Sequence, residues 1–137
     1  MNDGQTVYEA IGGEAGVKKL VDRFYDLMDT TPEGQAARAI HPKDLSESNQ
    51  KLFEYFSGWL GGPQLFVERR GPPMLRARHL HAPIAAPEIQ SWLICFMRAW
   101  REVVGSRPEI DELVLPQIHS LAHHMRNRED AQTDVKP

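Results

Sequence analysis

Four stretches of the chain carry apolar residues at steps of three and four, and this periodicity limits the possible folds more than any other feature. The stretches span residues 17–28, 52–60, 89–104 and 114–125. Such steps place apolar side chains on one face of a helix. No segment shows the sustained alternation of apolar and polar residues that is typical of a half-buried strand. The sequence therefore predicts an all-α fold.

Glycine and proline mark the expected helix boundaries, because glycine favours helix caps and proline cannot continue a helix. Breaks are predicted at Gly12–Gly13, Thr30–Pro32, Gly61–Pro63 and Gly71–Pro73. A short helix is expected near residues 33–39, and another helix should start at Ala86–Glu88 with proline in its first turn. Pro116 interrupts the last apolar pattern, so that helix should either be kinked there or begin there.

Length, charge and cysteine content exclude several classes of protein. The chain has 137 residues, which suits a single domain spanning 1–137, with a core over about residues 6–126 and a polar, frayed tail at 127–137. A net charge of −3 gives no general attraction to nucleic acid or an anionic membrane, and no apolar run is long enough to span a bilayer. Cys95 stands alone, and the N-terminal residues lack a signal-peptide pattern, so a cytoplasmic protein is expected.

Residues 62–86 form a long, loop-rich connection with room for only one or two helical turns. Loops of this length inside a helical protein are uncommon unless they have a function. This loop contains His79, so its length favours a ligand-binding role.

Six short motifs follow one another along the chain. They are Tyr8–Gly13 (YEAIGG), Arg23–Tyr25 (RFY), Leu60–Pro63 (LGGP), Arg70–Pro72 (RGP), Leu75–His79 (LRARH) and Trp92–Cys95 (WLIC). In their order and spacing the chain resembles the truncated haemoglobins, and within them the second group, over roughly residues 6–126. The resemblance implies a two-over-two helical sandwich around haem b, with a proximal helix of about one turn. Haem would be held without a covalent link, because the chain has no Cys-x-x-Cys-His motif.

The resemblance implies that His79 is the proximal ligand of the haem iron. A neutral imidazole is the usual globin ligand and leaves the opposite axial position open. His79 stands thirteen residues before Trp92, within the motif Leu75–His79. His81 is the alternative, because the family usually places proline two residues after the ligand and Pro83 has that spacing from His81. Residues two apart on a helix point about 200° apart, so only one of them can face the iron.

On the opposite, distal side, the resemblance places Tyr25 and Trp92 as polar contacts to a bound gas molecule. His41 stands where the family often has tyrosine or phenylalanine, and it could donate to Tyr25, to the ligand or to water. Ser48 occupies the position that many ordinary globins fill with histidine, and Leu52, one turn later, should form an apolar wall over the haem.

Further residues are expected around the haem. Lys51, Arg76 and Arg78 are candidates for contacts to the propionates, although exposed ion pairs contribute only about 0–1 kcal/mol. A second set could form either the pocket wall or the core, and the sequence does not separate the two roles: Phe56, Leu75, Phe96, Met97 and Ile118.

These residues support two functions. The first is reversible binding of dioxygen or another diatomic ligand. The second is a redox enzyme on the same haem, with peroxidase-like or nitric oxide dioxygenase activity. Dioxygenation would require a separate reductase, because the chain has no room for a flavin domain. A helical bundle without haem is the third reading, and the oligomeric state stays open.

Overall fold

The computed structural model describes residues 4–129, and this part of the chain is helical with no strand. The predicted all-α class is therefore confirmed. The helices are α1 (Val7–Ala10), α2 (Gly13–Thr30), α3 (Gln35–Ala39), α4 (Ser46–Trp59), α5 (Leu65–Arg70), α6 (Leu75–Arg78), α7 (Ala86–Val103) and α8 (Pro108–His124), with a 3-10 turn at Pro32–Gly34. No helix in this range is both long and apolar enough to cross a membrane.

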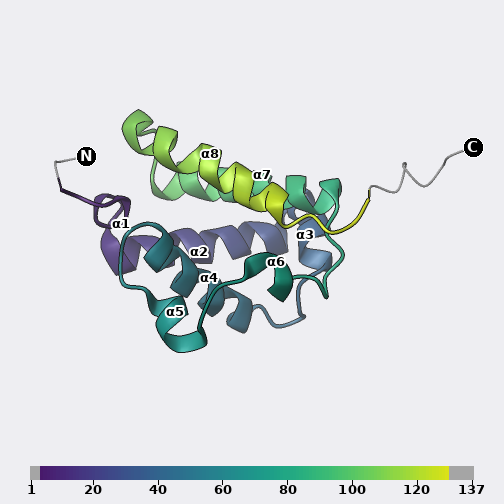
Figure 1. Cartoon of the computed structure of the whole chain (residues 1–137). Helices are drawn as coiled ribbons and strands as arrows, with labels where there is room; N and C mark the ends of the chain where they lie inside the picture. The colour runs from purple at the N-terminus through teal and green to yellow at the C-terminus, as the bar shows by residue number, and fades with distance from the viewer. Residues whose placement is uncertain (1–3, 130–137) are drawn as a thin grey trace, which may run out of the picture.

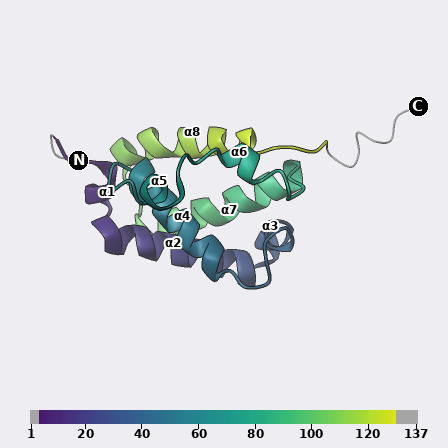
Figure 2. The ribbon, with the colours of Figure 1, turned by 60° about the horizontal axis from the view of Figure 1, so that its bottom comes forward.

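The long helices form two layers. Helix α2 packs against both α4 and α7, and α8 packs against α7. Figures 1 and 2 show α2 and α4 in one layer and α7 and α8 in the other, and α5 packs against α4. This is the expected two-over-two arrangement. Residues of both α4 and α8 line the cavity described below.

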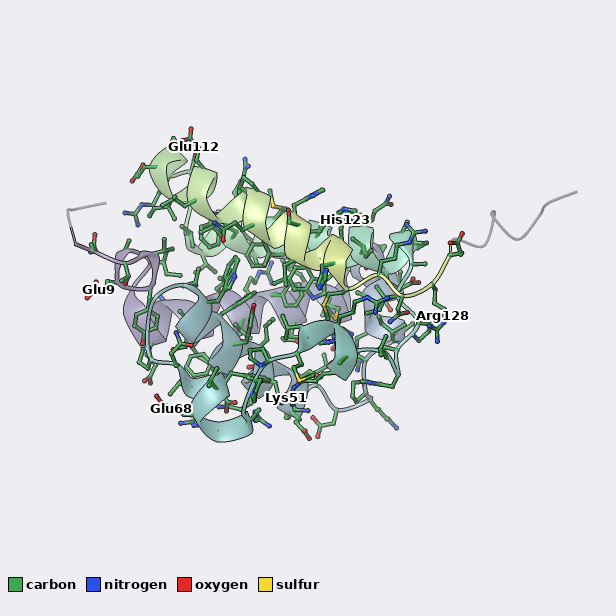
Figure 3. All side chains as sticks on the ribbon, viewed as in Figure 1. Glu9, Lys51, Glu68, Glu112, His123 and Arg128 are labelled. Atoms are coloured by element: carbon green, nitrogen blue, oxygen red, sulfur yellow. The ribbon has the colours of Figure 1, made fainter. Side chains whose placement is uncertain are left out.

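Aromatic side chains fill the contact between α2 and α7. Phe24 of α2 is fully buried and meets the Trp92 ring edge-on, with 4.9 Å between ring centroids. Trp92, Phe96 and Trp100 then stack along α7, with centroid separations of 5.6 and 5.9 Å. Charged side chains such as Glu68, Glu112 and Arg128 lie at the surface (Figure 3).

Two glycine-rich breaks occur where the sequence predicts them. Gly12 and Gly13 have φ of +112° and +63°, which L side chains rarely adopt, and they separate α1 from α2. Gly61, with φ of +101°, follows the end of α4. One turn into α2, Gly16 lies so close to α1 that a Cβ atom there would stand 2.0 Å from the carbonyl oxygen of Ile11. The bare Gly16 backbone therefore lets α2 start directly beneath α1.

Helix α8 begins at Pro108 and continues through Pro116, so the alternative that this helix starts at Pro116 is wrong. Proline removes the hydrogen bond to the carbonyl four residues earlier, which belongs to Glu112. Both residues are exposed, so water can satisfy that carbonyl. The exposed location explains why the helix tolerates the proline.

A buried carboxylate fixes the start of the long connection after α4. Glu54 is 2% exposed and pairs with Arg70 at 2.6 Å and with Arg69 at 3.0 Å, while Gln50 donates to it at 2.9 Å. Burial alone would raise the pKa of Glu54, but the hydrogen bonds from Arg70, Gln50 and Arg69 outweigh it and lower the pKa to about 2. The ionised carboxylate thereby ties α5 to α4.

Candidate functional site

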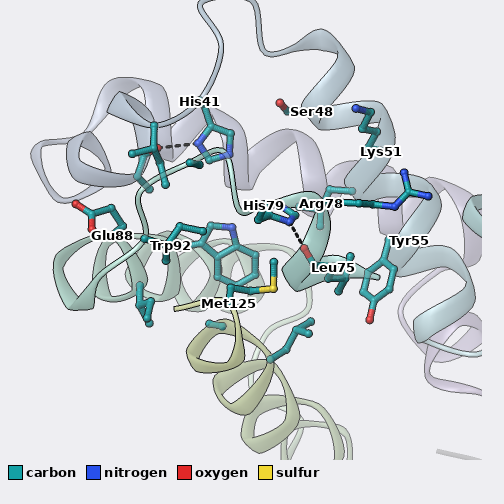
Figure 4. A pocket seen from close by; sticks show the side chains of 18 of the residues that line it. His41, Ser48, Lys51, Tyr55, Leu75, Arg78, His79, Glu88, Trp92 and Met125 are labelled. Carbon is teal, nitrogen blue, oxygen red and sulfur yellow. Dashed lines mark hydrogen bonds between the residues drawn. The ribbon is translucent and has the colours of Figure 1, made fainter. Parts of the chain in front are cut away.

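A cavity of about 440 Å³ lies between the two layers, bounded by α4, α6, α7 and α8 (Figure 4). Its size is typical of a small-molecule site. Most of the predicted site residues line it. They are Tyr25, His41, Ser48, Lys51, Leu52, Phe56, Leu75, Arg78, His79, His81 and Trp92.

Four predicted residues do not line this cavity. Phe96 and Ile118 belong to the core, at 1% and 0% exposure, which resolves the two roles that the sequence left open for them. The prediction for Met97 is wrong, because its side chain is 38% exposed and stands on the outer face of α7. Arg76 lies outside the cavity wall, where its guanidinium donates to the backbone carbonyl of Arg126 at 3.4 Å.

His79 is held with one ring nitrogen fixed. It follows the last residue of α6, and its Nδ1 lies 2.6 Å from the carbonyl oxygen of Leu75. A carbonyl only accepts, so Nδ1 carries the proton, and in the neutral ring Nε2 keeps its lone pair. Burial lowers the pKa of His79, which favours this neutral form. The ring is thus prepared to bind a metal through Nε2, and a backbone carbonyl on the other nitrogen is a common way to orient such a ligand.

His81 also borders the cavity, but its ring makes no hydrogen bond with the part of the chain that the structure describes. Its orientation is therefore less constrained than that of His79. This difference favours His79 as the ligand.

His41 has the same local arrangement on the other side of the cavity. Its Nδ1 lies 2.7 Å from the carbonyl oxygen of Ala37 and must donate to it. Burial lowers the pKa of His41, so the neutral ring is favoured, and its Nε2 can accept a hydrogen bond but not donate one. The sequence allowed His41 to donate a hydrogen bond to a bound ligand. That role is therefore unfavourable for the neutral ring, because its only N–H is used by the Ala37 carbonyl.

Tyr25 is 7% exposed and reaches the cavity from α2. Its hydroxyl donates to the backbone carbonyl of Ser48 at 3.3 Å, and burial raises the pKa of the phenol well above its usual value. The edge of the His41 ring lies near it, with 5.9 Å between centroids. The hydroxyl stays protonated, and its one O–H donor is engaged by the Ser48 carbonyl, which leaves its oxygen free to accept.

Trp92 brings a hydrogen-bond donor to the cavity. Its indole N–H has no hydrogen-bond partner among residues 4–129, whereas the indole N–H of Trp100 donates to Asp111 at 2.7 Å. The nitrogen of Trp92 points into the cavity in Figure 4. A donor facing a mainly apolar cavity is well placed for a polar ligand.

Two cations stand at the rim of the cavity. Lys51 pairs with Glu47 at 2.9 Å, and both side chains are largely exposed, so this pair is easily exchanged for another anion. Arg78 donates to the carbonyls of Arg70 and Pro72, both at 2.9 Å, and lies over the Phe66 ring. These hydrogen bonds of Arg78 therefore hold the loop that precedes α6 and His79.

Several cavity residues were not predicted from the sequence. Leu121 and Ala122 of α8, and Met125 just after its end, were recognised as an apolar stripe but not as part of the site. Asn127 was assigned to a frayed tail, yet its side chain hydrogen-bonds with His79, Ala82 and Ile84. That part of the tail prediction is wrong, and residues 130–137 of the predicted tail lie outside the described residues. No local pattern around Asn127 indicated these contacts.

The donor set of this cavity fits haem b. It combines the imidazole of His79, which has its proton fixed on Nδ1 and a lone pair on Nε2, with mainly apolar walls and cations at the rim. Apolar walls suit the porphyrin face, and Lys51 and Arg78 lie where they could meet propionates.

Comparisons with known proteins agree with this assignment. The family model for bacterial-like globins matches residues 6–127. A group 2 truncated haemoglobin of Bacillus subtilis (strain 168) is 39% identical over 125 residues, covering 91% of each chain. A group II 2-on-2 haemoglobin of Agrobacterium tumefaciens has a solved structure that superimposes with a TM-score of 0.89 at 47% identity, covering 94% of this chain and 98% of that one. The structure of a truncated oxygen-avid haemoglobin from Bacillus subtilis gives a TM-score of 0.80 at 39% identity, covering 90% and 100%.

Proposed function

Because this chain belongs to the bacterial-like globins, and within them to the group II truncated haemoglobins with haem b as cofactor, we propose that it binds dioxygen reversibly at an iron held by His79. When bound, haem would supply an iron that can bind a diatomic ligand. The relative of known structure from Bacillus subtilis is described as oxygen-avid, which supports dioxygen as the ligand.

One observation carries this proposal. The same cavity holds an imidazole with its lone pair available, at His79, and an indole N–H that has no hydrogen-bond partner in the described residues, at Trp92. The first group suits an iron ligand. The second suits a small molecule that accumulates negative charge on its outer atom, because a hydrogen bond to a charged acceptor is stronger than one to a neutral acceptor.

The other cavity residues have supporting roles in this proposal. Leu52, Phe56 and Leu75 form apolar walls that keep water from the site. The hydroxyl of Tyr25 can accept from one group while it donates to the Ser48 carbonyl, and it can turn from that 3.3 Å contact toward a ligand.

The proposal is tested by reconstituting the purified chain with haem and recording spectra of the ferrous, oxygenated and carbonyl forms. We expect stoichiometric uptake of dioxygen that reverses when the gas is removed. His79→Ala should lose the proximal bond in the carbonyl spectrum, and His81→Ala is the matched control that should retain it. Loss of the bond in His81→Ala instead would show that the ligand is the other histidine.

Reversibility is the decisive readout for binding as opposed to turnover. Steady consumption of dioxygen or peroxide that requires an added reductant, without a stable oxygenated form, would contradict reversible binding as the function.

A further inference from the structure

Asn127 closes a compact set of hydrogen bonds just beyond the end of α8. Its Nδ2 donates to the carbonyl oxygen of His79 at 3.2 Å and to that of Ala82 at 2.9 Å. Its Oδ1 accepts from the backbone N–H of Ile84 at 2.9 Å. Its own backbone N–H donates to the Ile84 carbonyl at 2.9 Å.

The partners define which way the amide of Asn127 must lie. Two of them are carbonyls, which only accept, and the third is an N–H, which only donates. A side chain turned over by 180° would face each of these groups with the wrong polarity. The arrangement therefore requires an amide and not an isosteric carboxylate.

The segment that contains α6 and His79 is also held on its N-terminal side, through Arg78. The Arg78 guanidinium bonds the carbonyls of Arg70 and Pro72, and Arg70 is itself paired with the buried Glu54. The short helix α6 has only four residues and none of them is buried, so it has little packing of its own. Fixed contacts on both sides must supply the rigidity that a longer helix would provide.

We propose that Asn127 is a positioning residue for the proximal ligand: by holding the carbonyl of His79 and the turn to Ile84 against the end of α8, it fixes the height and tilt of the His79 ring. The inference rests on the proposed role of His79. Asn127 does not touch the cofactor site itself, because it is absent from the cavity lining.

The test compares the haem-loaded wild type with Asn127→Ala and Asn127→Asp. The aspartate keeps the acceptor for Ile84 but loses both donations, so it tests the proposal even if the alanine variant folds poorly. Asn49→Ala is the matched control, because Asn49 also uses its side-chain amide, toward Asp22 and Lys18, away from the cavity. The readouts are the iron–histidine stretching band of the ferrous protein in resonance Raman spectra and the rate of haem transfer to an excess of an apo-globin acceptor.

Both Asn127 variants should shift or broaden the iron–histidine band and release haem roughly tenfold faster, while Asn49→Ala should match the wild type. Tenfold corresponds to about 1.4 kcal/mol, in the range expected from loss of one or two hydrogen bonds. Amide exchange at Ile84 should also become faster in Asn127→Ala, which removes the acceptor of the Ile84 N–H. An unchanged band and an unchanged rate in both variants would overturn the proposal.

A variant that lacks the His79 side chain separates this proposal from the assignment of His79 as the iron ligand. In His79→Gly supplemented with free imidazole, the ligand is no longer attached to the segment that Asn127 holds, so Asn127→Ala should leave the iron–imidazole band unchanged. A shift that persists in this background would mean that Asn127 acts on the cavity in another way, which would refute positioning through His79. If His79→Gly alone keeps the wild-type band, the assignment of His79 fails, and the positioning role proposed for Asn127 fails with it.

Discussion

Replacing Trp92 by phenylalanine isolates the electrostatic role of the indole N–H. The Trp92 ring is stacked on Phe96 at 5.6 Å and nearly parallel to it, and a phenyl ring can keep much of that contact. The principal loss is a donor that has no hydrogen-bond partner among residues 4–129, so no hydrogen bond within this range is broken. A hydrogen bond to a charged or strongly polarised acceptor contributes roughly 1.5–3 kcal/mol. Trp92→Phe should therefore speed dioxygen release roughly tenfold to a hundredfold.

Stopped-flow release rates for dioxygen and carbon monoxide provide the assay. Carbon monoxide carries little charge on its outer atom, so its release should change much less. Trp100→Phe is the matched control, because it removes an indole N–H that is bonded to Asp111 outside the cavity. That variant should be less stable but should keep the wild-type ratio of the two rates. Equal acceleration of both gases in Trp92→Phe would show that the indole acts as a steric gate and would refute the reasoning.

Three further predictions concern stability. Glu54→Gln should lower the free energy of unfolding by about 2–3 kcal/mol in chemical denaturation, less than the 3–5 kcal/mol of a fully buried pair because the Arg70 head group still reaches water; a loss below 0.5 kcal/mol would contradict it. Burial lowers the pKa of His41 below its ordinary 6.5, so the unfolded chain binds more protons just below pH 6.5. Stability of the haem-free protein should therefore fall as the pH drops through this value, and less so in His41→Phe; equal slopes would exclude His41 as a source. Gly16→Ala should cost roughly 1–3 kcal/mol in thermal unfolding, because its Cβ would collide with the Ile11 carbonyl, and an unchanged Tm would argue against that contact.

Much of the fold follows from local chemistry. Apolar periodicity places α2, α4, α7 and α8, and the positive φ angles at Gly12 and Gly61 explain why helices stop there. The likeness of short motifs to a known family predicts that Tyr25, His79 and Trp92 belong to one site. The structure places all three on the same cavity, although their roles there stay predictions.

Other features depended on how the helices are rotated and docked. Periodicity does not specify which edge of an apolar stripe faces a neighbouring helix. Met97 was therefore expected in the pocket wall or the core, but it lies on the outside of α7. The hydroxyl of Tyr25 donates to the carbonyl of Ser48, 23 positions away, and only the packing of α2 against α4 brings these two groups within 3.3 Å.

Asn127 is the clearest case of a contact that only the tertiary structure decides. In the sequence it is a polar residue after the last helix, 48 positions from His79. A hydrogen bond between such distant residues exists only once α8 has packed on α7 and brought its end beside the turn that follows α6. Local sequence determines helices because their bonds join residues four apart. The surroundings of His79 come from bonds between distant segments, and their geometry is defined only when the layers assemble.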